Sequence, residues 1–320
     1  MTVARLAAGD EPAIAVSGLS HAYGERQALS NVDLRIARGE MFGVLGPNGG
    51  GKTTLFKILA TLVPPQTGCV TIFGDDVAAD PFAVRSRLGV VFQHPGLDGK
   101  LTVAENLRVH GALYGLRSAE LRDRVPRVLA RLGLTDRSRD RVETLSGGLA
   151  RRAELAKGLL HAPELVLLDE PSTGLDPGAR RDFLQYLLHL RDQEGVTIVL
   201  TTHDMDEAER CDRVCFVHRG RVVAVDTPDA LKAQIGGDVV VVHTDDPERL
   251  LRRIRQRFDC QPTLVDGALR IEVPRAHEFA RDVVDAFAAD VRSVAFGKPT
   301  LEDVFVHLTG HRFWSEDAAA

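Results

Sequence analysis

The sequence predicts an α/β fold with a mainly parallel sheet, joined to a second, smaller α+β domain. Three observations support this prediction: short apolar runs typical of buried strands, helical periodicity between these runs, and a change of pattern at Gly236-Gly237. Strands that alternate with helices favour parallel pairing, with helices on the faces of the sheet. A chain of 320 residues has room for two such domains.

The elements of the first domain follow one another along residues 12–235. Helical patterns occupy residues 55–62, which Pro64-Pro65 follows, and residues 179–193. A longer helical block, about residues 98–160, interrupts the alternation and predicts an inserted helical subdomain. The apolar runs predict strands over residues 13–23, 29–39, 40–46, 68–77, 87–93, 164–170, 196–203 and 213–226.

The second domain is predicted over residues 238–310. Asp266-Gly267 is typical of the tight turn of a hairpin. The expected β-α-β-β-α-β order resembles a ferredoxin-like module. Its elements are a strand (238–244), a helix (247–258), the hairpin (263–273), a helix (276–288), a strand (291–297) and a last helix (301–310). Residues 311–320 are expected to form a disordered tail.

Charge and composition argue against several classes of protein. Nucleic-acid binders are usually basic, so a net charge of -5 argues against a nucleic-acid partner. No apolar run reaches the ~18 residues of a membrane span, and the N-terminus lacks the apolar core of a signal peptide. Four scattered cysteines fit the reducing cytoplasm. Cys211 and Cys215 lie close together without a second pair, so idle thiols are a simpler interpretation than a metal site.

A phosphate-binding motif, GPNGGGKT, lies between a predicted strand and a predicted helix. Its glycines let backbone N–H groups approach phosphate oxygens, Lys52 adds a positive charge, and the Thr53 hydroxyl can bind Mg²⁺. The motif therefore predicts a nucleoside triphosphate and Mg²⁺ as ligands. The residues predicted to hold the nucleotide are Gly46, Pro47, Asn48, Gly49, Gly50, Gly51, Lys52, Thr53 and Thr54.

Two acidic residues end the buried strand of residues 164–170. Ligands of open α/β sheets bind at the carboxyl ends of the strands, where Asp169 and Glu170 are expected. Asp169 is placed to hold the Mg²⁺ shell, and Glu170 to orient or polarise a water for attack on the γ-phosphate. Without the neighbouring glycine-rich motif, a solvated strand end would be the simpler interpretation.

With five further motifs in the same order, the chain resembles the ATPase subunits of ATP-binding cassette (ABC) transporters over residues 12–235. The resemblance identifies residues 46–54 as the Walker A loop and Asp169-Glu170 as Walker B with its catalytic glutamate. It implies that ATP and Mg²⁺ are the cofactors. It also implies roles for Tyr23 (stacking on adenine), Gln93 (Q-loop, near Mg²⁺ or water), Ser146, Gly147 and Gly148 (signature), Asp176 (D-loop) and His203 (switch histidine at the γ-phosphate).

In this family two ATPase subunits pair head to tail, so the signature of one completes the nucleotide site of the other. The resemblance implies that Ser146, Gly147 and Gly148 face an ATP held by the opposite subunit of a homodimer or heterodimer. Leu149 departs from the usual glutamine and removes one polar side chain from that contact. Arg151 and Arg152, which follow, are interpreted as a solvated helix face.

The ending PTLEDVFVHLTG, residues 299–310, resembles the ATPase subunits of ABC-2-type exporters, including the daunorubicin-resistance branch. That resemblance implies a separate membrane permease as partner and a cytoplasmic location at the inner face of the plasma membrane. The exported substrate could be a drug, lipid, glycan or ion. The alternatives are an importer ATPase and a non-transport ABC ATPase. Against the non-transport ATPase stand the single cassette, the lack of heptads between Thr54 and Leu145, and the acidic charge.

Overall fold

A computed structural model describes residues 11–94 and 96–310 of the chain. These residues form two units, which divide between Val222 and Val223. Within the described residues, no helix is both long enough and apolar enough to span a membrane. The tail predicted for residues 311–320 lies outside the described residues.

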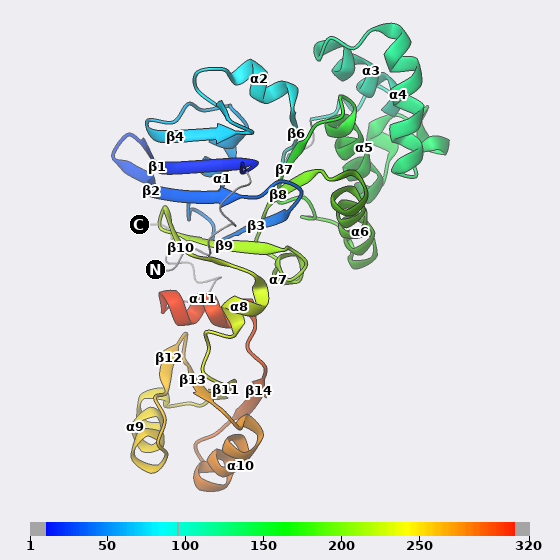
Figure 1. Cartoon of the computed structure of the whole chain (residues 1–320). Helices are drawn as coiled ribbons and strands as arrows, with labels where there is room; N and C mark the ends of the chain where they lie inside the picture. The colour runs from blue at the N-terminus through cyan, green and yellow to red at the C-terminus, as the bar shows by residue number, and fades with distance from the viewer. Residues whose placement is uncertain (1–10, 95, 311–320) are drawn as a thin grey trace. The chain divides into compact units, whose positions relative to one another are not determined.

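A six-stranded sheet lies mainly in the first unit, and most of its edge strand β10 belongs to the second (Figure 1). Its strand order is β10-β9-β3-β8-β7-β6, and its central pairs are parallel, as the sequence predicts. Every residue of β3, β7 and β8 is buried, because helices cover both faces of a parallel sheet. The strands are β3 (Met41–Leu45), β6 (Leu88–Val91), β7 (Leu165–Asp169), β8 (Thr197–Thr202), β9 (Arg213–His218) and β10 (Arg221–Asp226).

The predicted strands over residues 13–23 and 29–39 do not join this sheet. They form a separate antiparallel sheet of order β2-β1-β4-β5, in which Ile14 pairs with Ile36 on one side and Ile72 on the other. Alternating buried and exposed residues along β2 fit a sheet with one covered face. The strands are β1 (Ile14–Tyr23), β2 (Arg26–Ile36), β4 (Thr67–Ile72) and β5 (Asp75–Asp76).

Two segments predicted as continuous strands are interrupted by tight turns. Phe73 and Gly74 separate β4 from β5, and Arg219 and Gly220 separate β9 from β10. All four residues have positive φ angles, between 48° and 88°. Two successive residues in the left-handed conformation reverse the direction of the chain between two strands. The apolar pattern continues through the turn, so the sequence alone suggests one strand.

Helices α3, α4 and α5 gather at one side of the first unit, in the segment predicted as a helical subdomain (Figure 1). Pro126 lies inside α4, whose buried face is formed by Leu121, Val125, Val128 and Leu129. The helices of the unit are α1 (Lys52–Leu59), α2 (Pro81–Ser86), α3 (Val103–Leu113), α4 (Ser118–Arg131), α5 (Gly147–Leu159), α6 (Pro177–Glu194) and α7 (Met205–Ala208). Two short 3-10 turns, η1 (Thr135–Arg137) and η2 (Val142–Thr144), connect α4 to α5.

The second unit has the predicted β-α-β-β-α-β order, with a four-stranded antiparallel sheet of order β12-β13-β11-β14. This topology is that of the ferredoxin-like arrangement. Asp266 and Gly267, both with positive φ, make the hairpin turn as expected. The elements are α8 (Pro228–Lys232), β11 (Asp238–His243), α9 (Pro247–Arg257), β12 (Thr263–Val265), β13 (Ala268–Val273), α10 (Ala276–Phe287), β14 (Ser293–Gly297) and α11 (Leu301–Thr309).

Both faces of the small sheet carry buried side chains. One face packs on α9 and α10 through residues such as Leu250, Ile271 and Val283. On β13, alternate residues point to the other face, where Arg270 pairs with Asp303 of α11 and Glu272 pairs with His307. Helix α8, which the sequence pattern does not predict, packs on α11.

Candidate functional site

The glycine-rich loop joins β3 to α1, as the motif predicts. A Cβ atom added at Gly46 would lie 2.2 Å from the Val217 carbonyl oxygen, and one at Gly51 would lie 2.7 Å from the Ala28 carbonyl oxygen. Gly51 also has a φ of 115°, which side chains disfavour. Only glycine therefore fits these positions, and the backbone can follow its tight path.

Helix α1 begins without a side-chain cap and without an acidic residue in its first turn. The helices α5 and α6 of the same unit are capped by Ser146 and Asp176. The first N–H groups of an uncapped helix need other partners, and the helix dipole makes that end attractive to anions. This local geometry fits a phosphate group.

Lys52 lies at the start of α1 with only 5% of its surface exposed. Its Nζ donates to the carbonyl oxygens of Gly46 (2.6 Å) and Pro47 (3.1 Å), inside the loop. Burial lowers the pKa of Lys52, and the carboxylates of Glu170 and Asp169 partly offset this effect. Thr53, the next residue, is exposed, so its hydroxyl is free to face a ligand.

Asp169 and Glu170 lie at the carboxyl end of β7, next to β8 in the sheet. The Thr201 hydroxyl donates to Asp169 Oδ1 at 2.6 Å, and burial raises the pKa of Asp169 despite this bond. Glu170 has a φ of 44°, an unusual left-handed conformation for this residue type. Its N–H donates to both oxygens of Thr201, at 3.0 and 3.1 Å.

Three side chains from different elements converge on the carboxylate of Glu170. Gln93 Nε2 donates to Glu170 Oε2 at 3.1 Å, and His203 Nδ1 lies 3.3 Å from the same oxygen. The Thr173 hydroxyl lies 3.4 Å from it. The ends of β6, β7 and β8, which are neighbours in the sheet, bring these motifs together.

These residues fit a nucleotide with a bound Mg²⁺. The loop and α1 offer N–H donors, Lys52 offers a positive charge, and Thr53 and Asp169 offer oxygen ligands. Among the described residues, no cluster of three or more His, Cys, Asp and Glu side chains could hold a metal ion by itself.

The remaining predicted residues lie on other elements. Tyr23 ends β1 in the antiparallel sheet, is 48% exposed and contacts the His21 ring edge-on. Ser146 caps α5 by accepting from the Leu149 N–H at 3.4 Å, and Gly147 has open space around it. Asp176 caps α6 by accepting from the Ala179 N–H at 2.9 Å. The roles of these three residues toward a nucleotide stay predictions.

The prediction that Arg151 lies on a solvated helix face is wrong. Arg151 is only 8% exposed, and its guanidinium donates to four carbonyl oxygens of residues that flank the site. Arg152, its neighbour, pairs with Asp182 at 3.0 Å at the surface, as a solvated face would. The sequence of α5 gives no signal that separates the two residues, because side chains about 100° apart can both lie on a solvated helix face.

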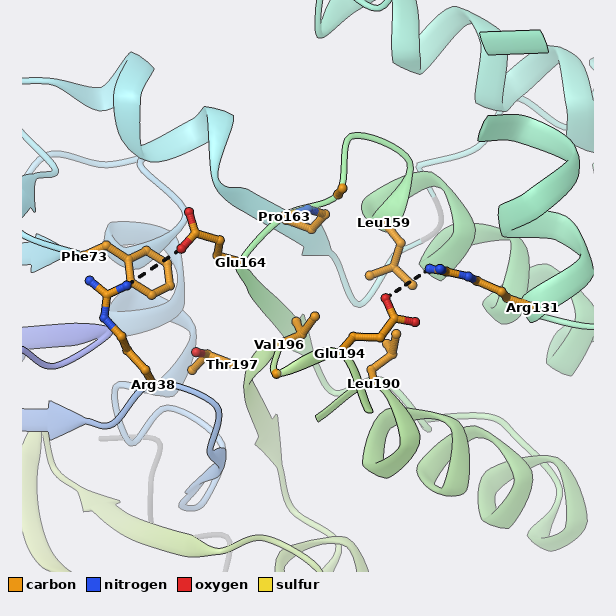
Figure 2. A pocket seen from close by; sticks show the side chains of 12 residues that line it. Arg38, Phe73, Arg131, Leu159, Pro163, Glu164, Leu190, Glu194, Val196 and Thr197 are labelled. Atoms are coloured by element: carbon orange, nitrogen blue, oxygen red, sulfur yellow. Dashed lines mark hydrogen bonds and ion pairs between the residues drawn. The ribbon is translucent and has the colours of Figure 1, made fainter. Parts of the chain in front are cut away.

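A cavity of about 410 Å³ lies at the amino ends of β7 and β8, opposite to the predicted site (Figure 2). Its lining includes Thr197, the first residue of β8, and Glu164, the residue before β7. Figure 2 shows its charged side chains paired: Arg131 with Glu194 at 3.0 Å, and Arg38 with Glu164 at 3.8 Å. None of the residues predicted to bind ATP lines this cavity. It is therefore separate from the candidate nucleotide site.

Comparison with known proteins agrees with this geometry. The family model described as ABC transporter matches residues 29–173, and a model of an AAA domain matches residues 141–207. The daunorubicin resistance ATP-binding protein DrrA3 of Streptomyces coeruleorubidus is 38% identical over 307 residues, which cover 94% of this chain and 96% of the relative. The chain belongs to the ABC transporter family of ATPases.

Another relative of this ABC ATPase is the Nod factor export ATP-binding protein I of Rhizobium sp. (strain N33), 36% identical over 93% of this chain and 97% of that protein. Among solved structures, CbiO1 of Clostridium perfringens, part of the ABC transporter complex CbiONQ, is 27% identical and has a TM-score of 0.65. That comparison covers 78% of this ABC ATPase and 97% of CbiO1.

A solved dimeric ATP-binding cassette bound to ADP and phosphate is 28% identical to this ABC ATPase, with a TM-score of 0.61. The comparison covers 67% of the present chain and 98% of the solved cassette. These findings confirm the predicted fold class and the prediction that the chain is an ATP-binding, ATP-hydrolysing protein.

Proposed function

We propose that this ABC ATPase powers export through a separate ABC-2-type permease, at the inner face of the plasma membrane. The observation that carries the proposal is the extent of the match to relatives named for drug resistance and Nod factor export. These relatives match 93–94% of the chain, whereas the dimeric cassette covers 67% of it. The similarity to exporters therefore reaches beyond the cassette, into the accessory unit that we assign to residues 238–310.

In this proposal the ATPase domain, residues 12–235, binds ATP at the start of α1. The N–H groups of Gly49, Gly51 and the first turn of α1 face the phosphates, and Lys52 neutralises their charge. Thr53, Gln93 and Asp169 hold a Mg²⁺ that neutralises charge on the phosphates. The uncapped start of α1 and the exposed Thr53 hydroxyl support this assignment.

Glu170 serves as the group that orients or polarises the attacking water. The contacts of its carboxylate support this role, because Gln93, Thr173 and His203 hold one of its oxygens in place. His203, at the end of β8, contacts the γ-phosphate and keeps its orientation through Glu170. The short distances that join Glu170 to Gln93 (3.1 Å) and His203 (3.3 Å) support this assignment of roles.

The signature completes the site of a second subunit. Ser146, Gly147 and Gly148 direct N–H groups and a hydroxyl to the ATP that the opposite chain holds, and Asp176 lies at the same subunit boundary. Ser146 and Gly147 are exposed at the start of α5, which supports this role. Tyr23 stacks on the adenine ring, for which its exposed ring is available.

Two apolar side chains, on helices that flank the Gln93 segment in the sequence, are strongly exposed and support contact with a partner protein. Phe82 on α2 is 81% exposed, and Leu113 on α3 is 80% exposed. These helices precede and follow the stretch from β6 to Thr102 in the sequence. Contact with a permease would remove both side chains from water.

The change Glu170→Gln tests the proposal most directly. The variant should bind ATP and form dimers that persist, because the water-activating carboxylate is lost while the phosphate contacts remain. We expect turnover to fall about 100-fold or more, within the range of general-base catalysis. Size-exclusion chromatography with ATP and a phosphate-release assay measure the two effects. Hydrolysis at the normal rate would remove Glu170 from the mechanism.

Export itself requires the permease. Purified wild-type chain should gain substrate-stimulated ATPase activity when it is reconstituted in vesicles with an ABC-2-type permease encoded beside it. A permease of another class as the only productive partner would contradict the export proposal while leaving the ATPase assignment intact.

A further inference from the structure

Helix α5 buries two charged side chains one turn apart. Arg151 is 8% exposed and Glu154 is 2% exposed. Burying a charge is costly unless nearly all of its polar atoms find partners. Both side chains have such partners: Arg151 binds backbone carbonyl groups, and Glu154 binds one backbone N–H and the side chain of Lys157.

The guanidinium of Arg151 holds three consecutive carbonyl groups at the carboxyl end of β7, those of residues 169–171. Its Nε donates to Pro171 O at 2.6 Å, and its Nη2 donates to Asp169 O at 3.1 Å and Glu170 O at 3.3 Å. The planar, rigid fork of arginine suits such a set of acceptors, which a lysine ammonium could satisfy only in part. Arg151 therefore fixes the path of the backbone that carries Glu170.

The same helix holds both sides of Gln93. Arg151 Nη1 donates to Phe92 O at 2.6 Å, and the Gly96 N–H donates to Glu154 Oε1 at 2.6 Å. The second oxygen of Glu154 pairs with Lys157 at 2.8 Å, so the carboxylate itself is held in place. Gln93, between these two anchor points, donates to Glu170 Oε2.

Glu170 needs such support, because its backbone has an unfavourable conformation. A residue other than glycine with a φ of 44° keeps that conformation only when its surroundings impose it. Thr201 accepts the N–H of Glu170 on one side, and Arg151 binds its carbonyl oxygen on the other. The peptide groups on both sides of the Cα atom are therefore anchored to neighbouring elements.

From this geometry we propose that Arg151 and Glu154 are positioning residues, which connect the signature end of α5 to Glu170 and Gln93 of the same chain. The inference rests on the proposed function, in which Glu170 activates water and the signature faces the ATP of the other subunit. Arg151 lies five residues after Ser146, about 7.5 Å along the helix. A shift of α5 at the signature is transmitted directly to the backbone of Glu170, so each bound ATP influences hydrolysis in the opposite site.

The experiment uses the purified full-length chain and the variants Arg151→Lys, Glu154→Gln and Glu154→Leu. Arg152→Lys is the matched control, because Arg152 is the adjacent residue and pairs at the surface with Asp182. The measurements are kcat and KM for ATP, the midpoint of thermal unfolding, and ATP-dependent dimerisation of each variant in the Glu170→Gln background.

We expect Arg151→Lys to lower kcat about 100-fold, because a misplacement of catalytic groups by about 1 Å has an effect of this size. The KM and ATP-dependent dimerisation should stay close to wild type, since Arg151 contacts neither ATP nor the signature. The lost buried hydrogen bonds should lower the thermal midpoint, but the variant should remain folded at the assay temperature. Glu154→Gln keeps an oxygen acceptor for the Gly96 N–H and should retain most of the activity. Glu154→Leu removes that acceptor and should lower kcat about tenfold. Arg152→Lys should behave like wild type.

A wild-type kcat in Arg151→Lys, or a rise in KM at constant kcat, would overturn the inference. So would a loss of activity that merely follows a loss of thermal stability, since that result would assign Arg151 a structural role alone. If Glu154→Gln and Glu154→Leu lost activity equally, the contact with Gly96 would not be the cause. Absence of hydrolysis by the wild-type chain would instead contradict the proposed function, so the two failures are distinct.

Discussion

The two helices that the proposal assigns to ATP binding, α1 and α5, start in opposite ways. Helix α1 has no side-chain cap and follows Gly51, whose φ is 115°. Helix α5 is capped by Ser146 and begins with two glycines that have ordinary helical geometry. The first helix follows a backbone turn that only glycine allows, whereas the second carries the buried charges Arg151 and Glu154.

This difference explains why glycine has a different purpose at each start. At Gly51, a Cβ atom would meet the backbone of Ala28 at 2.7 Å. At Gly147, a Cβ atom would meet nothing within 4 Å. The glycine of α1 is required by the fold itself, while that of α5 leaves open space where the proposal places a nucleotide.

The largest expected effect comes from comparing these two glycines. Gly51→Ala should lower the free energy of unfolding by about 3 kcal/mol, because it combines backbone strain with a steric clash. Gly147→Ala should leave it unchanged or raise it by about 0.5 kcal/mol, because alanine favours helix. Denaturant unfolding of both variants measures the difference. Equal losses of stability in the two variants would show that the contrast between the helix starts is wrong.

The phosphate loop could be predicted from sequence because its chemistry is local. The geometry of residues 46–53 depends on glycines within the motif and on the strand and helix beside it. The same is true of the hairpin at Asp266-Gly267, whose two residues specify the turn. The strand over residues 68–77 was not predicted correctly, because Phe73 takes a positive φ that its residue type does not announce.

The buried position of Arg151 could not be predicted from α5 alone. Its acceptors are the carbonyl groups of residue 92 and of residues 169–171, which other strands bring to the helix. Carbonyl groups are present at every residue, so no side-chain pattern marks the partner. The positive φ of Glu170 could not be predicted from the sequence either, because contacts with Thr201 and Arg151, which are distant in the sequence, impose it.

A smaller effect is expected from a carboxylate near the buried charges of α5. Glu207 on α7 is fully buried, and burial raises its pKa to about 7, although the Thr202 hydroxyl and the positive charge of Arg180 act in the opposite direction. Because the pKa of the folded state exceeds the ordinary value of 4.5, the protonated form is favoured on folding. Between pH 4.5 and 7 the unfolded chain ionises Glu207 while the folded chain keeps it protonated, so the cost of burying this carboxyl group, measured as lost free energy of unfolding, grows as the pH rises.

The change Glu207→Gln removes this cost. We expect it to increase the free energy of unfolding at pH 8 by about 2 kcal/mol more than at pH 5. Chemical denaturation at the two pH values measures this difference, and Glu209→Gln, at an exposed position of the same segment, is the control. An equal effect at both pH values would contradict the raised pKa, because it would mean that Glu207 ionises in the folded chain as easily as in the unfolded chain.

The smallest expected effect concerns the departure at the start of α5 itself. Leu149 is half-buried, and its N–H already donates to Ser146 Oγ, so Leu149→Gln should leave stability nearly unchanged. A glutamine would add one polar contact toward the opposite subunit, which is worth about 1 kcal/mol, or about fivefold in turnover. Steady-state ATPase assays at concentrations that support dimers measure this gain. An unchanged rate would show that backbone N–H groups and Ser146 suffice at α5. Both helix starts would then act mainly through backbone N–H groups, although their sequences differ.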